Sequence, residues 1–165
     1  MDKGKIWVAE CDGTFLIKMV GDVRVTLCAS LNRYIESIFA KGQGAARKVL
    51  VDLLSAQGLD STTLGLLVKL ALHCQRELGI RPVIFCQDES LLRTLEVMAI
   101  DELFTVIREG AQECAELAEL PPVAASEEEL RLQVLAAHRL LIEINPRCEA
   151  DFTDLIRSLE KAVSS

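Results

Sequence analysis

The feature that most constrains the fold of this chain is a short, almost wholly apolar run from Val49 to Leu54. A run of this kind is typical of a strand at the centre of a sheet or covered on both faces. The following stretch, Asp60 to Thr63, is rich in the residue types that begin helices, and apolar residues then return at helical spacing. These residues are Leu64, Leu67, Val68, Ala71 and Leu78. A buried strand that leads into a helix indicates an α/β domain.

A β-hairpin is predicted ahead of this run. Residues 5–11 and 14–20 both have strand-like sequences, and Asp12-Gly13 between them is a turn pair that tolerates positive φ. Gly21-Asp22 is expected to end the second strand.

Two helices are predicted on the basis of apolar spacing. The first runs from Leu27 to Ile38, with Gly42 and Gly44 as its stop, and the second covers 63–78 and ends at Gly79.

Two further strands are predicted over 82–86 and 103–107, separated by a helix that Asp88 or Ser90 would cap. Strands and helices that alternate at this interval predict an α/β domain over residues 1–110, with a mixed β-sheet packed against helices.

The charge distribution separates a C-terminal segment from this domain. Residues 1–110 carry 13 basic and 14 acidic side chains, a net of -1, whereas residues 111–165 carry 5 basic and 11 acidic side chains, a net of -6. We therefore expect a division near residue 110, with a helical extension over 111–165.

The extension is predicted to be wholly helical. A short helix is expected around Cys114, Leu117 and Leu120, followed by the breaker Pro121-Pro122. Ser126 and Glu129 then have the spacing of a capping box, which begins the first of two amphipathic helices joined at Asn145-Pro146.

These two helices form an antiparallel hairpin that buries too little apolar area to be stable alone. The short Pro121-Pro122 connection favours docking onto the same chain rather than onto a second copy.

Composition and motifs argue against several classes of function. The net charge of -7, without a basic stripe, argues against a nucleic-acid partner. His73 and His138 have no paired acid or nucleophile at a matching position, and Gly42-Gln43-Gly44 lacks the rest of a phosphate-binding loop. We therefore expect no catalytic residues, no metal and no cofactor.

Localisation is predicted from what interrupts the apolar runs. Asp2, Glu10 and Asp12 are incompatible with a secretory leader, while Asp52 and Lys69 break the candidate membrane spans. We expect a cytoplasmic protein with reduced cysteines and no direct insertion into a membrane.

The stretch Leu50-Val51-Asp52-Leu53, followed by Leu59-Asp60-Ser61-Thr62-Thr63-Leu64-Gly65, resembles the STAS domain of bacterial anti-sigma factor antagonists. The pattern of that family is an apolar strand, a short loop, and Asp-Ser-Ser/Thr-Gly-x-Gly at the start of a helix. The order of elements through residues 5–107 agrees, and Gly21-Asp22-Val23 matches a Gly-acidic-aliphatic step after the second strand. The likeness is greatest to antagonists that carry a C-terminal helical extension.

The resemblance implies partner switching under the control of phosphorylation. The unmodified protein would bind an anti-sigma factor or serine/threonine kinase and so free a sigma factor for transcription, for example in a stress response. The phosphorylated residue would be Thr62, with Ser61 as the second candidate, and a PP2C-type phosphatase is a further candidate partner.

The partner-binding surface that we expect combines the family positions with an apolar strip. The residues are Asp22, Arg24, Asp60, Ser61, Thr62, Thr63, Leu66 and Leu70. Leu66 and Leu70 lie off the face that carries Leu64 and Leu67, so they form a docking strip or are covered by the C-terminal hairpin. The chain departs from the family at Thr63, where many members have Gly, and at Arg24, where many have an acidic residue.

Three alternatives stay open at this point. Asp60 to Thr63 have the composition of an ordinary helix N-cap without further function. The same fold also suits a constitutive STAS-like scaffold subunit of a membrane transport complex, which would not be phosphorylated. The third alternative is an enzyme whose site the sequence does not reveal.

Deletion of residues 121–165 tests the expected docking of the hairpin. We expect the shortened chain to have a lower melting temperature or lower solubility than the full chain, because the surface that the hairpin covers becomes exposed. Circular dichroism melting and gel filtration measure both properties. A shortened chain that is monomeric and equally stable would contradict docking.

Overall fold

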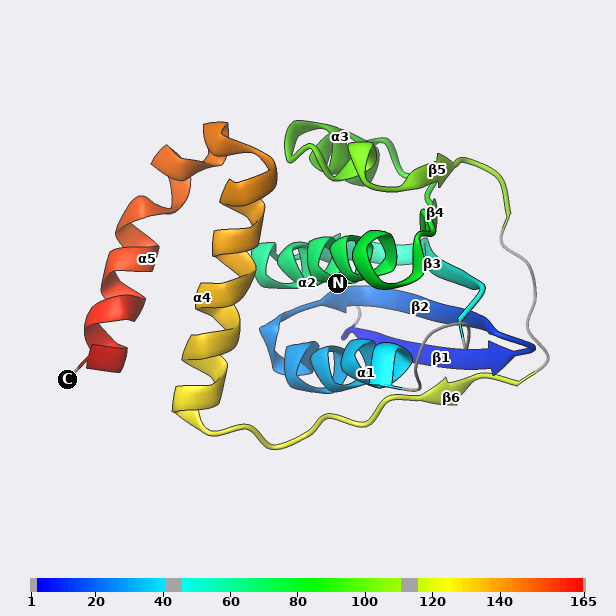
Figure 1. Ribbon diagram of the computed structural model, residues 1–165, viewed down its shortest axis with the longest axis horizontal. Coiled ribbons are helices and arrows are strands. Elements are labelled where there is room, and N and C mark those ends of the chain that lie inside the picture. Colours follow the sequence, from blue (N-terminus) through cyan, green and yellow to red (C-terminus); the bar gives the residue numbers. More distant parts are fainter. Residues whose placement is uncertain (1–2, 41–45, 111–115, 165) are drawn as a thin grey trace.

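In the computed structural model, which describes residues 3–40, 46–110 and 116–164, the apolar run belongs to strand β3 (Lys48–Leu59). β3 pairs in parallel with β2 (Thr14–Val23) on one side and with β4 (Val83–Phe85) on the other. The described strands form one mixed sheet in the order β5-β4-β3-β2-β1-β6 (Figure 1). The other three are β1 (Lys5–Cys11), β5 (Thr105–Ile107) and β6 (Ala118–Glu119). The predicted α/β fold with a mixed sheet is confirmed.

The predicted hairpin of β1 and β2 is present, with Asp12 and Gly13 at φ values of 50° and 81° in its turn. The second strand, however, does not end at Gly21-Asp22 as predicted. Gly21 has φ 74°, and the register of β2 against β3 shifts between Gly21 and Asp22, so the strand continues to Val23 through an irregularity. This continuation brings the ends of β2 and β3 together.

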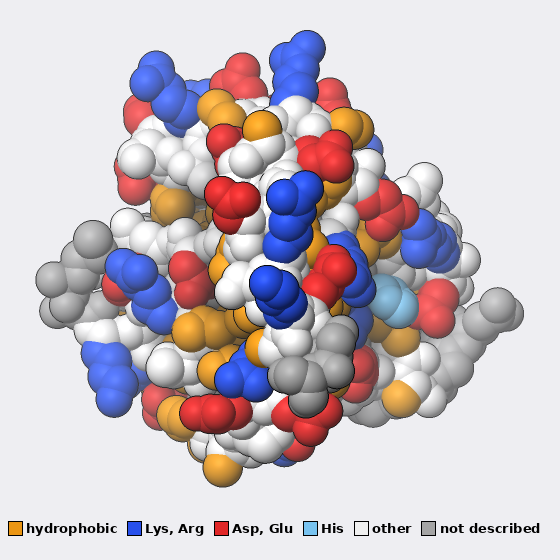
Figure 2. Space-filling view, turned by 90° about the vertical axis from the view of Figure 1, so that its left-hand side faces the viewer, with side chains coloured by type: hydrophobic (Ala, Val, Ile, Leu, Met, Phe, Trp, Pro, Cys, Tyr) orange, Lys and Arg blue, Asp and Glu red, His pale blue; other side chains and the backbone are white. Residues whose placement is uncertain are grey.

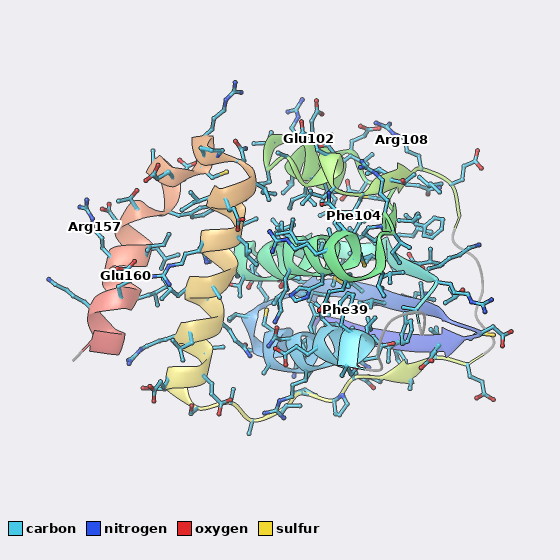
Figure 3. All side chains as sticks on the ribbon, in the orientation of Figure 1. Phe39, Glu102, Phe104, Arg108, Arg157 and Glu160 are labelled. Atoms are coloured by element: carbon cyan, nitrogen blue, oxygen red, sulfur yellow. The ribbon has the colours of Figure 1, made fainter. Side chains whose placement is uncertain are left out.

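Helices α1 (Cys28–Ala40) and α2 (Ser61–His73) pack with α3 (Glu89–Val97) against one face of the sheet. Figure 3 shows Phe39 of α1 directed toward α2, where its ring centroid is 5.2 Å from that of His73. The predicted stop of α1 at Gly42 and Gly44 lies outside the described residues.

The core beneath these helices is aliphatic, and its members alternate along the strands as a period of two requires. The fully buried members from the central strands and from α2 include Phe15, Ile17, Met19, Val51, Leu53, Leu67 and Val68. The predicted packing of α2 through Leu64, Leu67, Val68 and Ala71 is confirmed. A smaller cluster of strand side chains, which contains Leu16, Leu50 and Phe85, forms a separate apolar group.

The ends of α2 and α3 follow local rules. After α2 the chain forms a π-helical turn (Cys74–Leu78) and ends at Gly79, whose φ of 63° is the left-handed conformation expected of a C-terminal glycine. Of the two predicted caps of α3, Asp88 occupies the N-cap and accepts a hydrogen bond from the amide of Ser90 at 3.1 Å.

The predicted short helix around Cys114, Leu117 and Leu120 is wrong for its described part. Ala118–Glu119 instead form β6, which pairs with the outer edge of β1, and the amide of Leu120 donates to the carbonyl of Ile6 at 2.8 Å. The open edge of β1 supplies backbone partners that the sequence pattern of a short segment cannot reveal. Cys114 lies outside the described residues.

The C-terminal hairpin consists of α4 (Glu127–Ile144) and α5 (Glu149–Ser164), joined by a 3-10 turn. The Ser126 hydroxyl accepts from the amide of Glu129 at 3.1 Å, as the predicted cap requires. α4 packs across the N-terminal end of α2, and α5 lies on the outer side of α4 (Figure 1). The predicted docking of the hairpin onto the same chain is therefore confirmed. The division near residue 110 stays a prediction.

The packing of α2 predicts the effect of a core truncation. Leu67→Ala should lower the free energy of unfolding by about 2–5 kcal/mol, because it leaves a cavity beneath the helix at a fully buried position. Leu132→Ala is the matched control, since Leu132 is 45% exposed, and it should change stability by less than about 0.5 kcal/mol. Urea denaturation measures both values, and equal effects would contradict the assigned core.

Candidate functional site

The carboxylate of Asp60 organises the place where β2, β3 and α2 meet. Its Oδ1 accepts from the Thr63 amide at 2.9 Å and from the Thr63 hydroxyl at 2.7 Å. Its Oδ2 accepts from the amide of Val25 at 2.7 Å, across 35 residues of chain. Asp60 therefore acts as the N-cap of α2 and also fixes the chain that leaves β2.

The three hydroxyl residues that follow Asp60 lie in different environments. Ser61 is half-buried, Thr62 is 5% exposed and Thr63 is fully buried. Thr63 is held by Asp60, and its Oγ1 also lies 3.6 Å from the Cys28 thiol. The threonine that departs from the family pattern is thus accommodated by a buried polar contact between α1 and α2.

Ser61 contacts a residue that sequence reasoning did not place at the site. Its hydroxyl lies 2.7 Å from Nε2 of His138, which comes from α4 and is separated from Ser61 by 77 positions. Nδ1 of His138 lies 2.6 Å from the carbonyl oxygen of Val134, which only accepts, so this nitrogen carries the proton and Nε2 accepts from Ser61. No local sequence signal could have predicted this pair, because only the docking of the hairpin brings it together.

His138 is a buried structural residue. It is 1% exposed, and the ring of Phe152 from α5 meets it edge-on at a centroid distance of 4.8 Å. The expectation that neither histidine has a paired acid or nucleophile is wrong. His138 contacts the hydroxyl of Ser61, and Nδ1 of His73 lies 2.9 Å from Oε2 of Glu77, one turn along the same segment.

The exposed Arg24 and the partly buried Asp22 form the rim of the site. Arg24 Nε donates to Asp22 Oδ2 at 2.7 Å, and the Arg24 side chain is 59% exposed. The hydrogen bond and the negative charge of Asp22, with a smaller contribution from Asp60, raise the pKa of Arg24 above its usual value. Both residues line a cavity of about 460 Å³ that also contains Lys3 and Lys5. This rim is the open part of the predicted partner surface.

The predicted apolar docking strip is not exposed. Leu66 is 4% and Leu70 is 0% exposed, and both belong to the main core cluster. The apolar spacing of the sequence predicted that only one face of α2 is buried. In the structure the sheet, α1 and α4 surround the helix and bury its other apolar side chains as well. In this conformation Leu66 and Leu70 cannot contact a partner.

The thiol nearest to the site, that of Cys28, is unreactive at neutral pH. Burial raises the pKa of Cys28 to about 12, so the thiol stays protonated at neutral pH.

Within the described ranges, no group of three or more His, Cys, Asp or Glu side chains is arranged to hold a metal ion. No helix in the described part of the chain is both long and apolar enough to cross a membrane.

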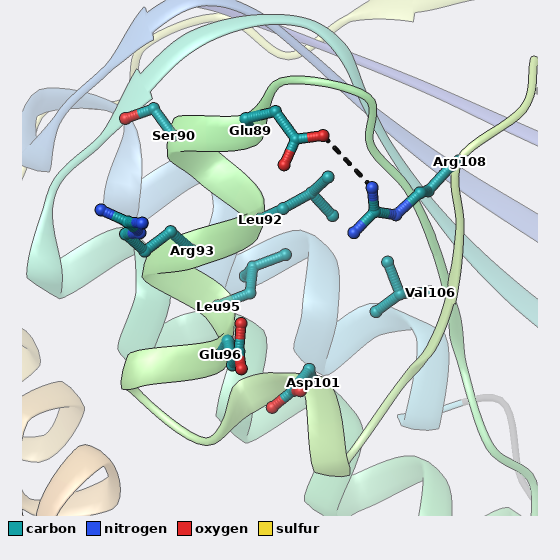
Figure 4. A pocket seen from close by; sticks show the side chains of 9 residues that line it. All are labelled: Glu89, Ser90, Leu92, Arg93, Leu95, Glu96, Asp101, Val106 and Arg108. Carbon is teal, nitrogen blue, oxygen red and sulfur yellow. Dashed lines mark hydrogen bonds and ion pairs between the residues drawn. The ribbon is translucent and has the colours of Figure 1, made fainter.

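A separate cavity of about 640 Å³ lies between α3 and β5, at one edge of the sheet (Figure 4). Leu92, Leu95 and Val106 give it apolar walls, and an ion pair between Glu89 and Arg108, 3.2 Å long, crosses its rim. Both charged side chains are mostly exposed. None of the predicted site residues lines this cavity.

Comparisons with known proteins agree with this fold. The model of the STAS domain family matches residues 5–113. The chain is similar to the crystal structure of an anti-sigma factor antagonist from Mycobacterium paratuberculosis, with 17% identity, a TM-score of 0.55 and coverage of 65% of this chain and 87% of that chain.

Two other solved structures are similar at lower scores. The anti-sigma factor antagonist SpoIIAA in its unphosphorylated form has 17% identity and a TM-score of 0.44, with coverage of 59% of this chain and 96% of that chain. A protein with a SpoIIAA-like fold from Shewanella loihica has 19% identity and a TM-score of 0.46, with coverage of 64% and 86%. No curated protein matches the chain significantly.

The contacts of Asp60 predict a large effect of its removal. Asp60→Ala should lower the free energy of unfolding by about 3 kcal/mol, because it removes a helix cap and leaves the Val25 amide without its partner. Asp88→Ala is the matched control, since Asp88 caps α3 at an exposed site through one amide, and should cost about 1 kcal/mol. Chemical denaturation compares the two variants, and similar losses would show that the long-range bond contributes little.

Proposed function

We propose that this chain, which belongs to the STAS domain family, acts as an anti-sigma factor antagonist whose binding is controlled by phosphorylation. In this proposal it works in the cytoplasm of a bacterial cell. The unmodified protein binds an anti-sigma factor or serine/threonine kinase, which frees a sigma factor, and a PP2C-type phosphatase reverses the modification. Residues 1–110 carry the binding function, and residues 111–165 are a separate extension.

The observation that carries the proposal is the position of Thr62 in the first turn of α2. Asp60 fixes this turn, and the ion pair of the exposed Arg24 with the partly buried Asp22 lies at the neighbouring end of β2. A partner that contacts this rim would therefore meet the start of α2. The same arrangement supports Thr62 as the modified residue, with Ser61 as the second candidate.

Because Thr62 is 5% exposed, a phosphate on it would disturb the packing at the start of α2 as well as the interface with a partner. It adds a charge of about -1.5 to -2 beside the carboxylate of Asp60. The N-terminus of a helix offsets about 0.3–1 kcal/mol of the resulting cost, whereas an unpaired charge buried in an interface costs several kcal/mol. Loss of the partner is the expected result.

Binding, rather than catalysis, accounts best for the polar groups at this site. Ser61 and His138 have the separation of a nucleophile and its base, 2.7 Å, but the imidazole is 1% exposed and the ring of Phe152 from α5 lies against it. A substrate carbonyl cannot reach the serine in this arrangement. We therefore propose that the protein has no catalytic activity of its own and that Thr62 is a substrate.

Substitutions of Thr62 test the proposal. Thr62→Glu should weaken binding to the purified anti-sigma kinase by about tenfold or more, because the added charge enters the contact. Thr62→Ala should bind as the parent chain does and should keep binding after incubation of the kinase with ATP. Isothermal titration calorimetry measures the affinities, and mass spectrometry identifies the phosphorylated residue.

Thr105→Glu is the control for added charge alone, because Thr105 is exposed on β5 at the edge of the sheet. It should leave binding unchanged. Equal affinities of the Thr62→Glu and Thr105→Glu variants would refute the switch and would favour the constitutive scaffold alternative.

A further inference from the structure

The crossing of α4 over α2 is unusually close at one point. A Cβ atom on Gly65 would lie 2.5 Å from both the Cβ and the carbonyl oxygen of Ala137, so only glycine permits this approach. Ala137 is 1% exposed. Two small residues therefore let α4 lie directly on the first turns of α2.

The same helix covers the hydroxyl residues at the start of α2. His138, which is adjacent to Ala137, accepts the hydrogen bond of Ser61. Thr62, the next residue of α2, is 5% exposed. Partner binding and phosphorylation in the proposed function both require this surface. In the structure it is occupied by the chain itself.

The hairpin is attached at its two ends by polar contacts. The hydroxyl of Ser30 donates to the carbonyl of Pro121 at 2.6 Å, before α4 begins. At the turn between the helices, Asn145 Nδ2 donates to the carbonyl of Val97 at 2.9 Å. Cys148, 5% exposed, places its thiol 3.8 Å from the sulfur of Met98.

The hairpin packs chiefly on α2 and adds only the edge of the main core cluster, where Leu140, Ile144 and Phe152 are partly buried. Among the described residues, Leu141 is its one fully buried member of the main cluster, and no described side chain of α5 is fully buried. Glu160 lies on the side of α5 that faces α4, where it pairs with Arg139 at 3.0 Å, while Arg157 points away (Figure 3). The outward side carries basic and acidic side chains together (Figure 2). Detachment would therefore leave the strands and their helices largely packed.

We infer that the α4–α5 hairpin is an intramolecular occupant of the partner-binding surface, so that partner and hairpin compete for the start of α2. This inference rests on the proposed function for the identity of the partner, but the occlusion itself is independent of it. A kinase or anti-sigma factor reaches Thr62 only after α4 has moved away. The hairpin thereby lowers the apparent affinity for the partner and the rate of phosphorylation.

Access to position 62 tests the inference without any partner. Thr62→Cys is introduced into the full chain together with Cys11→Ser and Cys114→Ser, and labelling by N-ethylmaleimide is followed at each thiol by mass spectrometry. Ala137→Glu places a charge against Gly65 and should open the hairpin. It should accelerate labelling at position 62 and at Cys148 by about tenfold or more.

Ala136→Glu is the matched control, because Ala136 is the preceding residue of α4 and is exposed. It should leave both rates unchanged. Cys86, which is 0% exposed, reports on the sheet and should stay unlabelled in both variants. Equal labelling at position 62 in the Ala136→Glu and Ala137→Glu variants would overturn the inference.

Labelling of Cys86 in the Ala137→Glu variant would mean that this substitution unfolds the whole chain. A milder pair of variants then tests the inference. His138→Ala removes the bond to Ser61, whereas Arg139→Ala changes an exposed neighbour. The inference requires faster labelling at position 62 in the first variant than in the second, with Cys86 protected in both. The absence of a difference would overturn it.

A kinase assay with the native threonine separates this inference from the proposed function. The purified anti-sigma kinase and ATP should phosphorylate the Ala137→Glu variant about fivefold faster or more than the Ala136→Glu variant. Equal phosphorylation rates, together with an opened hairpin in the labelling assay, would overturn competition. If no variant is phosphorylated, the proposed function fails, and the labelling result alone decides the occlusion.

Discussion

The carboxylate of Asp60 is the interaction on which the local architecture depends. One side chain caps α2, holds the Thr63 hydroxyl and binds the amide of Val25 at the end of β2. Three donor groups from two separate segments thus share one carboxylate, whose two oxygens can accept several hydrogen bonds. The ion pair of Asp22 and Arg24 lies directly before Val25, in the segment that this hydrogen bond joins to α2.

The hydrogen bonds of Asp60 lie where the two neighbouring strands β2 and β3 end. β2 and β3 run in parallel and end together, with Val23 opposite Leu59, so the segments that follow them are neighbours. In such sheets, ligands and partners are met where the strands end at their carboxyl side. The candidate site therefore lies where β2 and β3 end, while the charged cavity at the β5 edge lies elsewhere.

Local signals were sufficient for much of the fold. The Asp12-Gly13 turn, the buried β3 run and the caps at Asp88 and Ser126 each depend on a few adjacent residues, and the structure contains all of them. The strand β6 was mistaken for a helix because its partner is the edge of β1, more than 100 positions earlier. Gly21 was mistaken for a strand end because the irregularity that it occupies is defined by the pairing with β3.

The sequence alone determined the order of elements, the family pattern and the presence of two amphipathic C-terminal helices. Each of these follows from the spacing of apolar residues or from the types of adjacent residues. Only the tertiary structure decided what the hairpin covers. The pairing of Ser61 with His138 and of Gly65 with Ala137 depends on how two distant helices cross, which no local pattern encodes. For the same reason, Leu66 and Leu70 changed from a predicted docking strip to buried core residues when α2 became surrounded by the sheet, α1 and α4.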